Sequence, residues 1–238
     1  MRILAIGNSF SEDACRYIHR LAKADGRHVH TANLYIGGCS LDHHYRNMMG
    51  DKQAYTLQFN GESTGFQVSI SEALLSGRWD AVTIQQASHY SARKETYQPY
   101  ATQLAEYIRK YAPKTKLLVH ETWAYEEGSS RLHDVGGYET AAAMHADVVG
   151  AYAAMAADIK ADGIIRSGEL LAKLIERGVG PVHRDTFHLS LGIGRYAVGL
   201  LWYRTLLGAS VLENRFSDFD EPIPEETLAI IRETVESF

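Results

Sequence analysis

The sequence predicts an α/β protein with a parallel sheet of about five strands and helices on both faces. Short apolar runs alternate along the chain with segments of helical periodicity, which is the pattern of βαβ units. The runs end in small or polar residues, at the edge where such sheets bind their ligands. No Pro-, Gly- or Ser-rich linker divides the 238 residues, so we expect a single domain over residues 1–238.

Each predicted strand is a short apolar or alternating run bounded by turn residues. The first run begins at Arg2 and stops at Gly7, and the second alternates and ends at Gly37. Trp79 and Asp80 open the third run, and the fifth run is only a weak indication of a strand. The five strands are predicted over residues 2–6, 28–36, 81–85, 116–119 and 163–165.

Helices are predicted where apolar residues recur at intervals of three and four. Tyr100, Leu104 and Ile108 follow this spacing, and Gly178 closes the helix that begins near Leu170. The last helix follows two prolines, and we expect it to pack on the sheet. The predicted helices span residues 12–24, 68–77, 97–111, 138–161, 170–177, about 191–203 and 225–235.

Residues 41–65 are predicted to form a polar loop rich in aromatic side chains. Within it, the segment YTLQFNGES contains Asn60-Gly61, a dipeptide typical of tight β-turns, and indicates a small hairpin. The adjacent His43 and His44 have diverging side chains, so we expect a solvated loop there and no metal site.

Composition and charge argue against several kinds of partner. The net charge is −5 and no Lys/Arg stripe forms, so we expect no nucleic-acid partner. No apolar run reaches the ~18 residues that a membrane span requires.

The start of the chain predicts its compartment. Met1 leads directly into a strand without a basic and apolar leader, so we expect the chain as written to stay in the cytoplasm, although a removed leader would leave a similar start. Two cysteines make no disulfide framework, and no pattern indicates an oligomeric state.

Ser9 follows the first predicted strand in the motif Gly7-Asn8-Ser9-Phe10-Ser11. A strand, a tight turn and a helix would place its hydroxyl at the carboxyl edge of the sheet, beside backbone N–H groups that can hold an anion. This is one arrangement that exposes a nucleophilic serine. Taken alone, the motif is more typical of an ordinary turn in which Ser9 or Ser11 caps the helix.

A second group of reactive residues lies near the other end of the chain. Asp185 and His188 are three residues apart, which brings their side chains to one side of a turn. A carboxylate beside an imidazole fixes its tautomer and stabilises the imidazolium, so the pair can act as an orienting acid and a general base. Alternatively, Asp185 caps the helix that follows and His188 has no chemical role.

Taken together, these motifs resemble those of the SGNH/GDSL hydrolase superfamily. The early Ser, the Gly after the second strand, an amide after the third and the late Asp-x-x-His occur in the superfamily's order over nearly the whole chain. The block GNSF in place of Gly-Asp-Ser indicates a divergent branch. The resemblance implies a three-layer α/β/α fold of the flavodoxin-like kind and the activity of an esterase, lipase or carbohydrate acetylesterase.

The resemblance also implies a role for each matching residue. Ser9 matches the nucleophile, His188 the general base and Asp185 its orienting acid. The backbone N–H groups of Ser9 and Gly38 match the oxyanion hole. No metal or other cofactor is expected, because this chemistry needs none and the histidines lack metal-binding spacing.

The third-strand block departs from the superfamily, which has Gly-x-Asn-Asp where this chain has QQASH. A Gln amide can donate the same hydrogen bond as Asn from one methylene further out. We therefore expect Gln86 to supply the third oxyanion donor. Gln85 should point the other way if the strand pleat continues.

The resulting prediction is a serine esterase of SGNH type that removes acetyl or other short acyl groups from a carbohydrate. We expect Asn8, His89, Tyr90 and Trp123 to contact the substrate, since aromatic rings beside polar side chains suit a sugar. Two alternatives remain open. The protein can be a lipase or thioesterase for longer acyl chains, or a non-catalytic module that binds a small ligand or glycan on the same fold.

Overall fold

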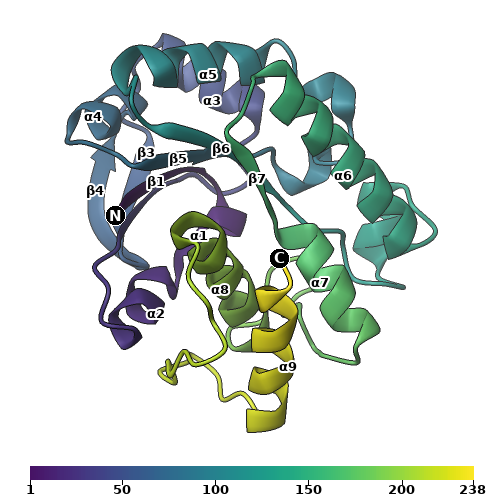
Figure 1. The fold of residues 1–238 in the computed structure, drawn as a ribbon. Helices are drawn as coiled ribbons and strands as arrows, with labels where there is room; N and C mark the ends of the chain where they lie inside the picture. The colour runs from purple at the N-terminus through teal and green to yellow at the C-terminus, as the bar shows by residue number, and fades with distance from the viewer.

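The computed structural model describes residues 1–238 and contains one sheet of seven strands in the order β4-β3-β2-β1-β5-β6-β7 (Figure 1). The strands are β1 (Arg2–Gly7), β2 (His30–Tyr35), β3 (Tyr55–Phe59), β4 (Glu62–Val68), β5 (Ala81–Ile84), β6 (Lys116–Glu121) and β7 (Gly163–Arg166). The helices are α1 (Ser9–Cys15), α2 (Ile18–Ala24), α3 (Leu41–Met49), α4 (Ile70–Leu75), α5 (Tyr100–Tyr111), α6 (Ala141–Asp158), α7 (Ser167–Glu176), α8 (Ile193–Leu207) and α9 (Glu225–Glu236).

Five of the strands, β2, β1, β5, β6 and β7, pair in parallel, which confirms the predicted parallel sheet. The sheet is nevertheless larger than predicted, because the hairpin β3–β4 joins it instead of standing apart in a loop. β3 pairs antiparallel with β2, with Ala32 opposite Phe59 and Tyr35 opposite Thr56. The sheet therefore has seven strands rather than about five.

The hairpin turns at Asn60-Gly61, as the sequence predicts. Both residues have positive φ, 52° and 85°, which is the geometry that makes Asn-Gly the favoured pair in a two-residue turn. A Cβ on Gly61 would lie 2.4 Å from the carbonyl oxygen of Arg16. Glycine at this position therefore lets the hairpin approach the end of α1 closely.

The sheet separates two apolar cores, and the residues of β1 alternate between them. Ile3 and Ala5 belong to the core that contains residues of α1, α2, α7, α8 and α9. Leu4 and Ile6 belong to the core that contains residues of α3, α4, α5 and α6. Figure 1 shows these two sets of helices on opposite sides of the sheet, which confirms the three-layer architecture.

The first predicted helix is divided in two, because α1 already begins at Ser9 and ends at Cys15. The break falls at Tyr17, whose ring is completely buried. Its hydroxyl donates to the carbonyl of Leu191 at 2.6 Å and accepts from the N–H of Asp220 at 2.7 Å. These contacts to distant parts of the chain, rather than helix propensity, decide the path here.

The prediction of a loop over residues 41–65 is wrong in its first part, which forms α3. Ser40 caps this helix, since its hydroxyl accepts from the N–H of His43 at 3.2 Å. Leu41, His44 and Met48 are buried along one side of it. His44 is completely enclosed, and its Nδ1 shares a 2.9 Å hydrogen bond with a tyrosine hydroxyl, so the expected solvated loop is wrong as well.

The C-terminal helix α9 packs on α7 and α8, whereas the sequence suggested packing on the sheet. The chain contains no helix that combines the length and the apolar character needed to cross a membrane.

Candidate active site

Ser9 lies at the carboxyl edge of the sheet, where β1 ends and α1 begins. The helix is capped by Asn8, whose Oδ1 accepts from the N–H of Phe10 at 3.0 Å. Ser11 completes a capping box, so Ser9 has no part in capping. A Cβ on Gly7 would lie 2.4 Å from the Ser11 hydroxyl oxygen, and only glycine fits this turn without a shift. The Ser9 hydroxyl is left free of the backbone.

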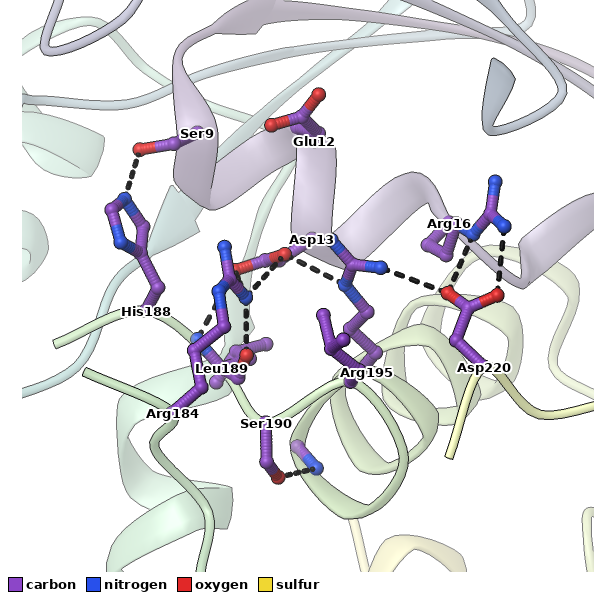
Figure 2. Close-up of polar contacts among 12 residues, drawn as sticks. Ser9, Glu12, Asp13, Arg16, Arg184, His188, Leu189, Ser190, Arg195 and Asp220 are labelled. Atoms are coloured by element: carbon purple, nitrogen blue, oxygen red, sulfur yellow. Dashed lines mark hydrogen bonds and ion pairs between the residues drawn. The ribbon is translucent and has the colours of Figure 1, made fainter. Parts of the chain in front are cut away.

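The fold brings His188 and Asp185 to Ser9 from the far end of the chain. His188 Nε2 lies 2.8 Å from the Ser9 hydroxyl oxygen (Figure 2). His188 Nδ1 lies 2.8 Å from Asp185 Oδ2, and the other carboxylate oxygen accepts from the backbone N–H of His188 at 2.8 Å. Asp185 does not cap a helix, because α8 begins only at Ile193.

The direction of these hydrogen bonds follows from the acceptor-only chemistry of a carboxylate. His188 Nδ1 must carry the proton that faces Asp185, and the neutral ring then offers an unprotonated Nε2 to the Ser9 hydroxyl. Burial raises the pKa of Asp185, but the hydrogen bonds from the His188 side chain and backbone lower it further, leaving it below its ordinary value. The three side chains are thus arranged as a hydroxyl, a base and an ionised acid.

A buried ion cluster ties α1 to the loop that carries the imidazole (Figure 2). Asp13 on α1 is completely buried. Its carboxylate accepts from Arg184 Nη1 at 3.0 Å, from Arg195 Nε at 2.8 Å and from the backbone N–H of Leu189 at 3.1 Å. We refer to Asp13, Arg184 and Arg195 as the ionic support, because they fix the position of the His188 loop relative to α1.

The ionic support is extended by two further residues, Asp220 and Arg16 (Figure 2). Arg195 also donates to Asp220 at 2.8 Å, and Asp220 pairs with Arg16 at 2.7 Å. The hydrogen bond from Arg16 is the main reason that the pKa of Asp220 falls to about 2. These contacts join α1, α8 and the segment that leads into α9.

Two backbone N–H groups at this edge are free to bind a ligand. Ser9 is the first residue of α1, so its N–H has no acceptor within the helix. Gly38 has a φ of 62°, which favours glycine, and its N–H donates to no other backbone group. Asn8 Nδ2 donates to the carbonyl of Cys39 at 3.1 Å and holds the Gly38 loop against the Ser9 turn.

Gln86 occupies a different place from the predicted one and supplies no oxyanion donor. Its side chain is completely buried, and Nε2 donates to the carbonyl and the hydroxyl of Thr96 at 3.2 and 3.1 Å. Its Oε1 accepts from the N–H groups of Leu41 and Ala87, both at 2.9 Å. The amide is fully used in fixing the loops that follow β2 and β5.

Gln85, predicted to point away, supports the Ser9 turn instead. The predicted alternation fails because β5 ends at Ile84. Gln85 Nε2 donates to Asn8 Oδ1 at 2.9 Å, and its Oε1 lies 2.6 Å from His120 Nδ1. His120 Nε2 lies 3.0 Å from the hydroxyl of Ser167. We refer to the four buried side chains of this chain of hydrogen bonds as the neutral support: Asn8, Gln85, His120 and Ser167.

The proton positions in the neutral support follow from the N–H of Phe10, which needs an oxygen acceptor. Asn8 must turn its oxygen toward that N–H, so Gln85 offers its NH₂ to Asn8 and its oxygen to His120. His120 is therefore protonated on Nδ1 and accepts from the Ser167 hydroxyl on Nε2. Burial lowers the pKa of His120 to about 3, which keeps the ring neutral.

Two of the four expected substrate contacts are wrong, because their side chains are buried. Trp123 is 1% exposed, stacks on Phe10 with 4.1 Å between the ring centroids and donates to the carbonyl of Phe187 at 2.7 Å. Asn8 is 2% exposed and is occupied by its cap and its two neighbours. Trp123 thus supports the reactive loops by packing against Phe10 and by its hydrogen bond to Phe187.

His89 and Tyr90, the other two, stay partly exposed in a single helical turn after β5. Their rings lie 4.2 Å apart. Burial lowers the pKa of His89, and the positive charges of Arg93 and Arg131 lower it further. Both side chains are therefore partly accessible, at the carboxyl end of β5.

A cavity of about 490 Å³ is present in the structure, and Ser9 is not among the residues that line it. It is bounded by α6, α7 and residues 179–183, and its lining is mostly apolar. The indole ring of Trp123 forms one wall of the cavity and also stacks on Phe10. It therefore lies between the cavity and the Ser9 turn. No group of three His, Cys, Asp or Glu side chains converges in a way that could hold a metal ion.

Sequence reasoning missed Asp13, His120 and the role of Gln85. The sequence signal for Asp13 and His120 would have been a polar residue among apolar neighbours in a helix or strand. Asp13 is flanked in α1 by the buried residues Phe10, Ala14 and Cys15, and His120 follows the apolar residues of β6. Such residues need buried partners, which could have been sought among the arginines and amides of the chain.

Comparison with known proteins assigns the chain to a family. A model described as a domain of unknown function, DUF4886, matches residues 2–227. A search among curated proteins gives no match. Among solved structures, a DUF4886 family protein from Bacteroides uniformis is 31% identical with a TM-score of 0.91, and the match covers 100% of this chain and 93% of that one.

Two hydrolase structures share the fold at lower identity. A protein from Slackia heliotrinireducens, described as a candidate SGNH hydrolase, is 24% identical with a TM-score of 0.61, over 87% of this chain and 98% of that one. An acetylxylan esterase from Geobacillus stearothermophilus is 12% identical with a TM-score of 0.54, over 87% and 94%. The chain has the fold of the SGNH/GDSL hydrolases, and it belongs to the DUF4886 family.

Proposed function

We propose that this protein is a serine esterase that removes acetyl or another short acyl group from a carbohydrate. The observation that carries the proposal is the unbroken path of hydrogen bonds from Ser9 through His188 to Asp185, with two contacts of 2.8 Å. A serine hydroxyl, a neutral imidazole and an ionised carboxylate in this order are the working parts of acyl transfer to water.

In the proposed reaction, the Ser9 oxygen attacks the ester carbonyl while His188 Nε2 accepts the hydroxyl proton. The N–H groups of Ser9 and Gly38 stabilise the oxyanion that develops, and His188 passes its proton to the departing alcohol. A water molecule then attacks the acyl group on Ser9 and loses its proton to His188. The bond between the acyl carbon and the Ser9 oxygen breaks, the carboxylic acid leaves, and His188 returns the proton to Ser9. Asp185 holds the ring in the reactive tautomer and stabilises the imidazolium during both steps.

The oxyanion site proposed here consists of two backbone donors. Each donor of this kind typically contributes about 100- to 1,000-fold in rate. With Gln86 occupied elsewhere, the positions of the two N–H groups depend on the neutral support, because Asn8 holds both the start of α1 and the Cys39 carbonyl. Where the superfamily has an Asn that donates to the oxyanion, this chain therefore has amides that position the backbone donors instead.

A short acyl group and a sugar fit the surroundings of the site. Trp123 closes the site from the large apolar cavity, and the side chains that stay accessible, His89 and Tyr90, are aromatic and polar. The likeness of fold to an acetylxylan esterase also supports this choice. The second candidate is a lipase or thioesterase, and the observation that favours it is the 490 Å³ apolar cavity behind Trp123.

The test is hydrolysis of p-nitrophenyl acetate, butyrate and octanoate by the wild type, Ser9→Ala and Ser63→Ala. We expect turnover that falls with acyl length, loss of nearly all activity in Ser9→Ala, and wild-type rates in Ser63→Ala, which alters an exposed serine on β4. Faster turnover of octanoate would favour the lipase. Equal rates for Ser9→Ala and the wild type would contradict the proposed nucleophile.

A fluorophosphonate probe separates the esterase from a non-catalytic binding module. The probe reacts with an activated serine, so we expect mass spectrometry to find a single adduct on Ser9. Release of acetate from an acetylated xylan or similar glycan would then identify the substrate class. A protein that binds glycan but leaves Ser9 unlabelled would be a binding module.

A further inference from the structure

Arg131 carries a positive charge that no acceptor in the protein neutralises. It begins a single π-helical turn, Arg131–Gly136, and is partly buried. Its guanidinium carbon lies 3.7 Å from the centroid of the Phe187 ring and 5.4 Å from that of Tyr125. It takes part in none of the ion pairs of the chain, although Asp134 follows on the same turn. Its N–H donors remain available to a ligand.

The guanidinium stands close to the proposed catalytic residues. Phe187 directly precedes His188, and the two rings lie 3.8 Å apart. One aromatic ring therefore separates the charge of Arg131 from the imidazole. A flat cation stacked on a ring keeps a fixed orientation, with its N–H edge directed outward from the contact.

A second unpaired cation acts on the same side of the site. Arg93 is exposed, makes no ion pair and lies 5.9 Å from the Tyr90 ring. The charges of Arg93 and Arg131 both act on His89, which lies between β5 and these arginines in the chain. His89 itself is neutral or positive, so it adds no negative charge. Two guanidinium groups without ion-pair partners therefore act on His89, although the whole chain has a net charge of −5.

We propose that Arg131, assisted by Arg93, forms a subsite for a carboxylate carried by the alcohol part of the ester. The substrate class is then an acetyl ester of an acidic sugar, such as a uronic acid, rather than of a neutral one. A guanidinium binds a carboxylate through two parallel N–H···O contacts, which fixes the orientation of the sugar as well as its charge. This inference rests on the proposed esterase function.

The first experiment compares two acetyl esters that differ in one charge, 4-acetoxybenzoate and its methyl ester. The readout is the ratio of their kcat/KM values, so differences in intrinsic reactivity cancel between variants. We expect Arg131→Gln to lower this ratio by about fivefold to tenfold, mainly through KM, and Arg131→Lys to lower it less. An unchanged ratio in Arg131→Gln would overturn the proposal.

The matched control is Arg78→Gln. Arg78 is exposed and unpaired, and it precedes β5 at the opposite edge of the sheet. The substitution removes the same charge from the protein, and we expect the ratio to stay at its wild-type value. A fall in the ratio equal to that of Arg131→Gln would show that net charge, rather than a subsite, is responsible.

A binding experiment tests the subsite independently of catalysis. Calorimetry on Ser9→Ala compares methyl glucuronoside with methyl glucoside, and then repeats the pair with Ser9→Ala/Arg131→Gln. We expect the glucuronoside to bind more tightly only while Arg131 is present. Such binding, together with a wild type that hydrolyses none of the esters tested, would reject the proposed function and keep the subsite. Equal affinities for the two sugars would reject the subsite.

Discussion

The two halves of the candidate site are held by supports of opposite chemistry. The Ser9 turn rests on the neutral support, a fully buried chain of amides, an imidazole and a hydroxyl in which every proton has an assigned position. The His188 loop is held by the ionic support, in which one buried carboxylate receives two guanidinium groups and a backbone N–H. Each support connects segments that lie far apart in the sequence.

Because of this difference, the two halves should respond differently to the loss of a hydrogen-bond partner and to acid pH. A buried charge that loses its partner leaves an uncompensated charge, which is costly, whereas a neutral hydrogen bond that is lost leaves one unsatisfied polar group. The neutral support also responds to pH, because burial lowers the pKa of His120 to about 3. At mildly acid pH the unfolded chain therefore binds a proton at this ring that the folded chain does not bind.

The largest effect is expected for Asp13→Ala, which leaves Arg184 and Arg195 without their shared partner. We expect the free energy of unfolding in urea to fall by about 3–5 kcal/mol, in the range found for breaking a buried ion pair from one side. Asp218→Ala is the control, since its carboxylate is 79% exposed and pairs with Arg20. That substitution should cost under about 1 kcal/mol. Similar losses for both would mean that the ionic support is only a surface contact.

A smaller effect with a sharper functional readout is expected for Gln85→Met and Gln86→Met. Both residues are buried amides at the end of β5, and each substitution should cost about 1–3 kcal/mol of stability by leaving its partners unsatisfied. Only Gln85 holds Asn8, so Gln85→Met alone should lower kcat for p-nitrophenyl acetate, by about 10- to 100-fold. A greater loss of kcat in Gln86→Met would restore the original assignment of Gln86 as an oxyanion donor.

The smallest effect concerns pH and His120. Burial lowers the pKa of His120 from an ordinary 6.5 to about 3, so between these values the unfolded chain binds a proton that the folded chain does not. The stability due to the neutral ring is complete above pH 6.5 and is lost as the pH falls. From pH 7 to pH 5.5 this loss is about 1 kcal/mol for one such histidine.

The measurement is urea unfolding of the wild type and His120→Gln at pH 7 and 5.5. His120→Gln should lose about 1 kcal/mol less than the wild type over this interval. His44 and His183 also have a lowered pKa through burial, so the variant keeps part of the pH dependence. Identical losses in the two proteins would show that His120 is accessible to protons in the folded state.

Much of the fold could be predicted because it depends on local patterns. The strands are apolar runs with turn residues at their ends, and their length and order determine a parallel sheet with helices on both faces. The approach of Ser9, Asp185 and His188 could also be predicted, since their motifs occur in the order of a known superfamily. What they do chemically stays a proposal until it is measured.

What could not be predicted depends on contacts between distant segments. The period-two rule assigned Gln85 and Gln86 to the wrong sides because the strand ends one residue earlier. Trp123 was expected to contact the substrate because aromatic rings beside polar side chains suit a sugar, whereas its ring stacks on Phe10 and is buried. The hairpin was recognised, but the pairing of β3 with β2 was not, since the sequence of β2 does not show which strand lies next to it.

The separation between Ser9 and His188 has a consequence for synthesis on the ribosome. The N-terminal half of the sheet can form early, but the serine stays without its imidazole until the segment through Arg195 has emerged and Asp13 has received its guanidinium partners. An incomplete nascent chain therefore cannot hold the hydroxyl and the ring together. Under the proposed function, the protein remains unreactive toward cellular esters until the segment through Arg195 has been translated.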